Sequence, residues 1–338
     1  MLFPVAPYSA SLMTAPAPDY SRFRCLRCLT GHEKSVYALA LSLTGEHLYS
    51  WSLDGALKIW DLASGHCLRT LTGLHQIKGL WISAREEYLV TYSWDEPIQC
   101  RHLPARQSLN EGYSFGSRQP VSSLAINSTE TCLASADWNH HIHLWQFPTG
   151  DYLGPLVGHQ GDINSLTFTS DNRYLISGSW DGTIRCWDLD LGACVQVLTS
   201  HSQQFDKAVI TQDASRIVAL GKNKAISIWD VRQGKCRKTV RGHSKSIADL
   251  LVSPDNHVII TASWDESIRF WELETGHCFH QQREHQGRIW CAALSRDGRY
   301  LVTGGQDRQI RLWGNYLPTE DRQNEAALDH SIIPESMQ

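Results

Sequence analysis

The stretch Ser179-Trp180-Asp181-Gly182, followed closely by Ile184-Arg185-Cys186-Trp187, recurs along the chain in variant forms such as Ser263-Trp264-Asp265-Glu266 before Trp271. Its last residue belongs to a ladder of tryptophans that stand 42 residues apart: Trp145, Trp187, Trp229, Trp271 and Trp313. Trp60 lies 85 residues before Trp145, close to two further periods. A constant period of this length indicates that one supersecondary unit has been copied, so the chain is a repeat protein.

Each unit has the pattern of short strands joined by turns. In the clearest copy, residues 158–198, segments that alternate apolar and polar side chains are separated by turn sequences such as Asp181-Gly182. Strands of four to six residues are typical of this pattern. The unit is therefore predicted to hold four antiparallel strands, at 163–168, 174–177, 184–187 and 194–198.

Marker residues recur in a fixed order within the units: a Gly-His pair near the start, an Asp in a turn, and Trp-Asp or a variant at the end. Four units carry them with little change: Gly31-His32 with Trp60-Asp61, Gly158-His159 with Trp187-Asp188, Gly242-His243 with Trp271-Glu272, and His285 with Asp307 and Trp313. Three units are degenerate at marker positions: the second with Arg101, the third with Ser117 and Asn139, and the fifth with Ala219 and Asn223. With these units the chain resembles WD40 repeat proteins over residues 22–315.

The resemblance implies an all-β fold, a seven-bladed WD40 β-propeller whose blades each hold four antiparallel strands. The last unit ends after Trp313 without a fourth strand, while segment 23–29 matches the fourth-strand sequence of other units. We therefore expect this N-terminal strand to complete the last blade and close the ring. Residues 22–316 would form the propeller, with 1–21 as a flexible N-terminal segment and 317–338 as a disordered polar tail.

The resemblance also implies a hydrogen-bonded tetrad of His, Ser or Thr, Asp and Trp inside each well-preserved blade. A Ser-His-Asp set can serve a hydrolase, but an active site would appear once, whereas this set appears four times. We therefore interpret it as structural, and we expect no catalytic residues, no cofactor and no enzymatic activity. The four sets are His32, Ser50, Asp54 and Trp60; His159, Ser177, Asp181 and Trp187; His243, Thr261, Asp265 and Trp271; and His285, Thr303, Asp307 and Trp313.

In WD40 propellers, partners bind a top face lined by three positions per blade: the third and fifth residues after the His, and the residue before the turn Asp. In this sequence those positions are rich in aromatic and charged residues, which are prominent at protein interfaces. The resemblance thus implies a protein- or peptide-binding scaffold; alternatively, the indoles cover the neighbouring blades. The candidate residues are Tyr37, Leu53, Lys78, Trp94, Trp138, Asp162, Asn164, Trp180, Asp206, Lys222, Trp264, Arg288, Trp290 and Gln306.

Two other classes of function remain open. The element Trp229-Asp230-Val231-Arg232 resembles the WDxR motif by which some WD40 substrate receptors dock on a ubiquitin-ligase adaptor, and Arg232 would then be needed for docking. A small-ligand binder or an enzyme would need one blade with a unique acid-base or metal set near the central channel, and the sequence reveals none.

His140-His141-Ile142-His143 is the one cluster of histidines. On a strand, His141 and His143 lie on the same face and could contact a metal ion together. The sequence reveals no third ligand, and His143 occupies a position that is Lys or Arg in other units, so we expect no metal site. The ten cysteines are expected to be reduced, because several share one repeat position and are thereby held apart: Cys67, Cys194, Cys236 and Cys278.

The net charge of −4 gives the protein no general attraction for nucleic acid or for acidic membranes. No apolar run reaches the roughly 18 residues that a membrane-spanning helix needs. Residues 1–18 lack the basic start of a secretory signal and are broken by four prolines. We expect a cytoplasmic, intracellular protein that acts as a monomeric platform within a protein complex.

Overall fold

The computed structural model describes residues 18–74, 76–93, 96–103, 112–115, 120–200 and 204–316, and it describes 112 and 113 by their backbone alone. Most of the expected N-terminal segment, 1–17, and the whole expected tail, 317–338, lie outside the described residues. Trp94 of the candidate top face and Ser117 of the third unit also lie outside them.

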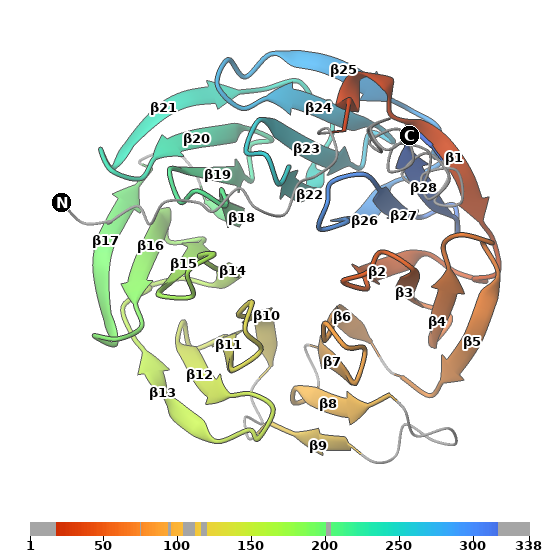
Figure 1. The fold of residues 1–338 in the computed structure, drawn as a ribbon. Coiled ribbons are helices and arrows are strands. Elements are labelled where there is room, and N and C mark those ends of the chain that lie inside the picture. The colour runs from red at the N-terminus through yellow and green to blue at the C-terminus, as the bar shows by residue number, and fades with distance from the viewer. Residues whose placement is uncertain are drawn as a thin grey trace, which may run out of the picture.

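The described chain forms seven four-stranded antiparallel sheets, the blades of a β-propeller (Figure 1). The first strand of each blade lies nearest the central axis and the fourth lies at the outer rim. Blade one holds β2 (Val36–Leu41), β3 (His47–Ser52), β4 (Ala56–Asp61) and β5 (Cys67–Thr72); blade two holds β6 (Ile77–Ile82), β7 (Tyr88–Ser93), β8 (Gln99–His102) and β9 (Gly112–Ser114); and blade three holds β10 (Val121–Ile126), β11 (Cys132–Asp137), β12 (Ile142–Gln146) and β13 (Tyr152–Leu156).

The remaining blades repeat this order and confirm the fold expected from the repeat pattern. Blade four holds β14 (Ile163–Phe168), β15 (Tyr174–Ser179), β16 (Thr183–Asp188) and β17 (Ala193–Thr199); blade five holds β18 (Phe205–Ile210), β19 (Arg216–Gly221), β20 (Ile226–Asp230) and β21 (Lys235–Val240); blade six holds β22 (Ile247–Val252), β23 (Val258–Ser263), β24 (Ile268–Glu272) and β25 (Cys278–Gln282); and blade seven holds β26 (Ile289–Leu294), β27 (Leu301–Gly305), β28 (Ile310–Gly314) and β1 (Arg24–Leu29).

The N-terminal strand β1 closes the ring, as expected, by pairing antiparallel with β28. Figure 1 shows β1 in red alongside β28 in blue. A short 3-10 helix, η1 (Tyr20–Arg22), precedes the strand, and Tyr20 and Phe23 are 3% and 1% exposed. Both rings pack against Phe270 of blade six. Packing therefore begins before residue 22, within the segment that was expected to be flexible.

The hydrophobic core lies between neighbouring blades. Between blades four and five, for example, Ile176 and Ile184 pack with Phe205 and Trp229, and all four are at most 5% exposed. Seven such clusters run around the described ring, one for each pair of adjacent blades, including the pair of blades seven and one. A blade cannot bury both faces alone, so closure of the ring gives each blade the two neighbours it needs.

Side chains near the axis also tie one blade to the next. The Ser165 hydroxyl of blade four accepts a hydrogen bond from the Ala208 backbone N–H of blade five at 2.8 Å. Asp249 of blade six pairs with Lys207 of blade five and accepts the Ala292 N–H of blade seven at 2.8 Å. The bonds from Ala208 and Ala292 give two backbone N–H groups an acceptor in the preceding blade.

The innermost strand of every blade carries a β-bulge near its start. In blade one, Val36 pairs with Ser52 and Ala38 pairs with Trp51, which leaves Tyr37 as the extra residue. A bulge bends the strand and re-aims the side chain of its extra residue. The seven extra residues are Tyr37, Lys78, Ser122, Asn164, Asp206, Ala248 and Trp290.

Candidate functional site

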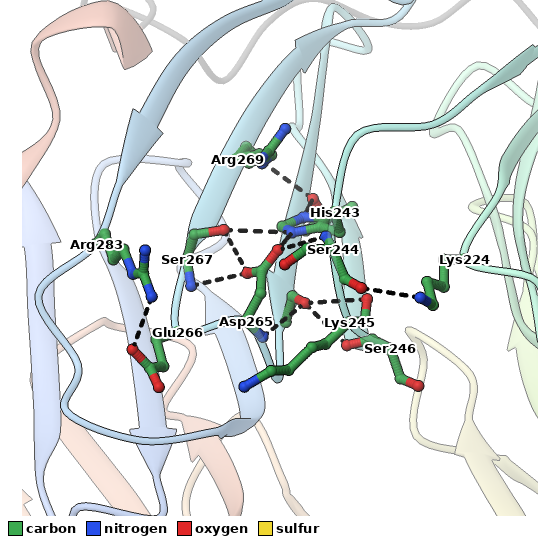
Figure 2. Close-up of polar contacts among 12 residues, drawn as sticks. Lys224, His243, Ser244, Lys245, Ser246, Asp265, Glu266, Ser267, Arg269 and Arg283 are labelled. Carbon is green, nitrogen blue, oxygen red and sulfur yellow. Dashed lines mark hydrogen bonds and ion pairs between the residues drawn. The ribbon is translucent and has the colours of Figure 1, made fainter.

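The tetrads join three parts of a blade, and Figure 2 shows the contact between His243 and Asp265 in blade six. His243 Nδ1 lies 2.9 Å from Oδ2 of Asp265, and His243 Nε2 lies 2.8 Å from Oγ1 of Thr261. The Trp271 indole N–H donates to the same Oγ1 at 2.9 Å. Because a carboxylate only accepts hydrogen bonds, Nδ1 of this histidine carries the proton.

The other three sets have the same geometry. The Nδ1-to-carboxylate distances are 2.9 Å for His32, 2.7 Å for His159 and 2.9 Å for His285. The four tetrad histidine side chains are at most 1% exposed, so a substrate cannot reach them. This burial suits a structural tie rather than a catalytic triad, which needs an accessible nucleophile.

Burial and hydrogen bonding shift the pKa values within the tetrads. Burial lowers the pKa of His32 and His159 below the usual 6.5, against the opposing effect of their carboxylate partners. Burial alone would raise the pKa of Asp181, but hydrogen bonds from His159, Thr183 and the Gln160 N–H together lower it. The folded protein thus favours a neutral imidazole beside an ionised carboxylate.

We expect the stability of the protein to fall on acidification in two stages. Below pH 6.5 the unfolded chain binds protons on His32 and His159 before the folded chain does, so unfolding becomes easier. Below pH 3.8 the same argument applies to Asp54 and Asp181, whose pKa values are lowered in the folded state. Urea denaturation at about pH 7.5 and about pH 5.5 measures the first stage. An unfolding midpoint that rises at the lower pH would contradict the tetrad electrostatics.

Two degenerate blades restore the lost hydrogen bonds with other residues. In blade five, where Ala219 replaces the tetrad hydroxyl, Ser227 of the next strand accepts the Trp229 indole N–H at 2.9 Å. In blade two, Arg101 replaces the tryptophan, and its guanidinium donates to Thr91 at 3.0 Å. In blade five the Ser227 hydroxyl donates in turn to the Ala219 carbonyl of β19 at 3.3 Å, so both units keep a tie between their middle strands.

The candidate top-face positions meet at one end of the blade in five of the described blades. The backbone N–H of the residue before the turn Asp donates to the carbonyl of the third residue after the His position. The bulged residue of the innermost strand follows that third residue by two positions. Five described blades share this bond, at 2.8–3.1 Å: Leu53 to Ser35, Trp180 to Asp162, Lys222 to Gln204, Trp264 to Ser246, and Gln306 to Arg288. The end of the ring that carries these residues is called the top face below.

An aromatic cluster spans blades six, seven and one on the top face. Trp264 and Trp290 meet edge to face at 5.1 Å between ring centroids, and Tyr37 stacks on Trp290 at 4.7 Å. The Arg288 guanidinium lies over both indoles, at 4.9 Å and 5.9 Å from their centroids. Cation–π contacts of this kind hold a charged group beside apolar surface.

A second cluster joins blades four and five. The Trp180 indole N–H donates to Asp206 at 2.8 Å, and Lys222 Nζ lies 3.4 Å above the indole ring. Burial raises the pKa of Asp206, although the Trp180 hydrogen bond and Lys222 oppose that shift. Trp180 and Trp264 therefore each contact the next blade around the ring.

The other candidate residues range from half-buried to exposed. Lys78 donates to the Ser122 carbonyl, and burial lowers its pKa to about 8. Asn164 donates to the Asp162 carbonyl at 3.3 Å. Trp138 and Leu53 are 54% and 46% exposed. Exposed side chains also belong to Lys222, Arg288 and Gln306.

The histidine pair of blade three has a neighbour that the sequence did not reveal. Asp137, at the end of β11, lies beside His141 and His143, and one ligand atom from each of the three lies within 4.8 Å of the others. Asp137 occupies the repeat position that is Ser179 in blade four, so an acidic side chain replaces a neutral polar one. Alignment of the third unit with the fourth could have shown this replacement.

The WDxR-like element is mostly internal. Trp229, Asp230 and Val231 are at most 5% exposed, and Asp230 forms ion pairs with Arg216 and Arg237. Arg232 is exposed. Docking through this element would therefore rely on the Arg232 side chain.

Comparison with known families assigns the chain. The profile described as "WD domain, G-beta repeat" matches residues 23–61, 110–146, 150–188, 234–272 and 276–314, which is more than half of the sequence. The chain belongs to the WD40 repeat family. The second and fifth units of this WD40 protein, which carry Arg101 and Ala219, fall outside the five matched segments.

The WD40 protein is similar to parts of larger proteins. It is 31% identical over 134 residues to "Periodic tryptophan protein 2 homolog" of Mus musculus, which covers 39% of this chain and 14% of that protein. It is 26% identical over 129 residues to "U3 snoRNP-associated protein-like YAO" of Arabidopsis thaliana, covering 38% and 21%. With "Nuclear distribution protein PAC1" of Arthroderma otae the identity is 29% over 180 residues, covering 43% and 37%. The chain thus matches well under half of the length of these relatives.

In the part of the chain that the structure describes, no helix combines the length and the hydropathy required to span a bilayer.

Proposed function

We propose that this WD40 protein is a non-enzymatic scaffold that binds a protein or peptide partner on its top face. Trp138 carries the proposal, because it is 54% exposed at the repeat position where Trp180 and Trp264 are partly buried and contact the next blade. Exposed tryptophans are energetically prominent in protein interfaces. The ring supplies a rigid frame that holds this side chain at a fixed place.

Charged side chains on the top face also support partner binding, because protein interfaces commonly have a polar rim around an apolar anchor such as Trp138. Arg288 and Lys222 present cations beside their indoles, and the Asp162 side chain is 41% exposed. Mixed charge of this kind favours orientation and selection of a protein partner more than raw affinity. The buried tetrads support the non-enzymatic part of the proposal.

The relatives suggest membership in a larger assembly. One of them is named as U3 snoRNP-associated, and a snoRNP is a ribonucleoprotein, so RNA belongs in the test as a bridging component. Our expectations of a cytoplasmic location and of no nucleic-acid partner stay predictions.

We expect Trp138→Ala to release the main partner of the top face. Loss of an anchoring tryptophan typically weakens binding by about 2 kcal/mol or more, which is roughly 30-fold. Affinity purification of the full chain with quantitative mass spectrometry, with and without ribonuclease, measures the loss. Arg288→Ala tests the second cluster of the same face.

Leu191→Ala is the matched control. Leu191 is 70% exposed and lies in the turn between β16 and β17. Because the strands are antiparallel, this turn is at the opposite end of the blade from the turn between β15 and β16. Equal partner recovery from all three variants and the parent would refute a binding role for the top face. If the parent loses its partners only after ribonuclease treatment, the top face binds RNA and not a protein.

A further inference from the structure

Blade three departs from the other blades at three repeat positions at once. Asp137, His141 and His143 stand where blade four has Ser179, Thr183 and Arg185, and where blade six has Ser263, Ser267 and Arg269. Each replacement introduces a side chain that commonly ligates metal ions. The three positions are separated in the repeat, yet the hairpin of β11 and β12 brings them to one place.

The geometry at that place is organised around the Asp137 carboxylate, which is 4% exposed. Its Oδ1 accepts the backbone N–H groups of Asn139 at 3.0 Å and His141 at 2.9 Å. Its Oδ2 lies 3.1 Å from Nε2 of His143. The two bonds to Oδ1 fix the carboxylate, and Oδ2 faces His143 and, at 3.4 Å, the side-chain NH₂ of Asn139.

The far side of His143 is also fixed. Its Nδ1 lies 3.0 Å from the hydroxyl oxygen of Tyr152 on β13. Metal-bound histidines commonly use their second nitrogen in such a hydrogen bond, which orients the ring and selects the nitrogen that faces the ion. Tyr152 thus holds Nε2 of His143 toward Asp137.

We propose that Asp137, His141 and His143 bind a divalent transition-metal ion of the zinc type. Zinc bonds of about 2.0–2.2 Å place two tetrahedral ligands about 3.3–3.6 Å apart, a few tenths of an ångström more than the 3.1 Å between Asp137 Oδ2 and His143 Nε2. A rotation of the His141 side chain completes the triangle, since its ligand atom is within 4.8 Å of the other two. A water molecule would take the fourth position.

The site lies at the top face, next to Trp138 in the sequence, in the blade whose turn Asp is replaced by Asn139. Elsewhere the tetrad Asp accepts hydrogen bonds from its own turn and from a buried histidine, and so fastens the turn to the blade. A metal ion would fasten the turn of blade three in another way. This inference does not depend on the proposed partner binding.

A plain hydrogen bond between Asp137 and His143 is the competing explanation, and His141 distinguishes the two. Among the described residues, none hydrogen-bonds to the His141 ring, whose contact is the edge-to-face packing on His143 at 6.3 Å between centroids. The hydrogen-bond explanation therefore gives the His141 ring no function, whereas metal binding requires it.

The test uses the full chain, treated with a chelator and titrated with ZnCl₂ by calorimetry and with Co²⁺ by visible absorption. We expect the parent to bind one more equivalent than His141→Ala. Tyr152→Phe should bind the same ion about tenfold more weakly. His140→Asn should bind like the parent, because His140 is outside the cluster and asparagine tolerates its positive φ of 67°.

Each other outcome would overturn the inference. Equal zinc stoichiometry and affinity in His141→Ala and the parent would place the ion elsewhere, and a Co²⁺ spectrum dominated by thiolate bands would place it on cysteines. Absence of binding to the parent would exclude the site. If His141→Ala fails to fold, as judged by circular dichroism without metal, the Tyr152→Phe titration decides, and an unchanged affinity there counts against the site.

Discussion

Phe23→Ala is expected to lower the free energy of unfolding by about 3–5 kcal/mol, the usual cost of removing a buried phenylalanine ring. Phe23 is 1% exposed, and its ring centroid lies 4.8 Å from that of Tyr20 and 5.8 Å from that of Phe270. Its carbonyl also accepts hydrogen bonds from His280 and Gln282, both at 3.0 Å. The residue therefore fastens the start of β1 to blade six, and the cavity would loosen the closure of the ring.

Chemical denaturation followed by tryptophan fluorescence measures this effect. Phe279→Ala is the matched control, because Phe279 lies on the outer strand β25 and is 37% exposed. We expect it to cost well under half as much. If the two variants unfold at the same denaturant concentration, the N-terminal closure contributes little to stability.

Asp265→Ala is expected to cost about 1–3 kcal/mol, because it leaves buried donors without an acceptor. The Asp265 carboxylate accepts His243 Nδ1–H at 2.9 Å and the backbone N–H groups of Ser244 and Ser267, both at 3.0 Å (Figure 2). The Ser267 hydroxyl adds a fourth hydrogen bond. We expect a cost toward the upper end of the range, since several donors lose their partner together.

Asn139→Ala removes the side chain at the same repeat position of blade three. Asn139 is exposed, and its side-chain NH₂ makes one long contact with Asp137 at 3.4 Å. Its replacement should change the unfolding free energy by less than about 1 kcal/mol. An Asp265→Ala variant no less stable than Asn139→Ala would show that the tetrad of blade six does not stabilise the protein.

The architecture was predictable because each unit carries the same marker residues and turn sequences at the same positions. The tryptophans at 42-residue intervals and the Asp-Gly turns set the blade length, and the position of segment 23–29 gave the closing strand. Packing of Tyr20 was not predictable in this way, because η1 lies outside the repeat and no other unit offers a template for it.

The candidate surface was predictable in position but not in contacts. The repeat register located Trp180 and Trp264, whereas their partners, Asp206 and Arg288, belong to the next blade and depend on how blades are set against each other. The hydrogen bond that replaces the missing tetrad hydroxyl of blade five was not predictable either. Ser227 accepts the Trp229 indole N–H in place of a hydroxyl at Ala219, but Ser227 lies on the adjacent strand and at no marker position. Asp137 was missed because it occupies neither a marker position nor a top-face position, and the units were compared at those positions.

The antiparallel pairing of β1 with β28 also determines how the ring would respond to mechanical tension between its ends. Arg24 begins β1 and Gly314 ends β28, and these two residues are direct partners, while Leu29 and Ile310 pair at the far end. A force that pulls the chain before Arg24 away from the chain after Gly314 would act at one end of the β1–β28 ladder. It would break the hydrogen bonds between the two strands one after another, as in unzipping, whereas a shear force would load all of them together. Pulling the two ends apart would therefore open blade seven first, at the pair of Arg24 and Gly314.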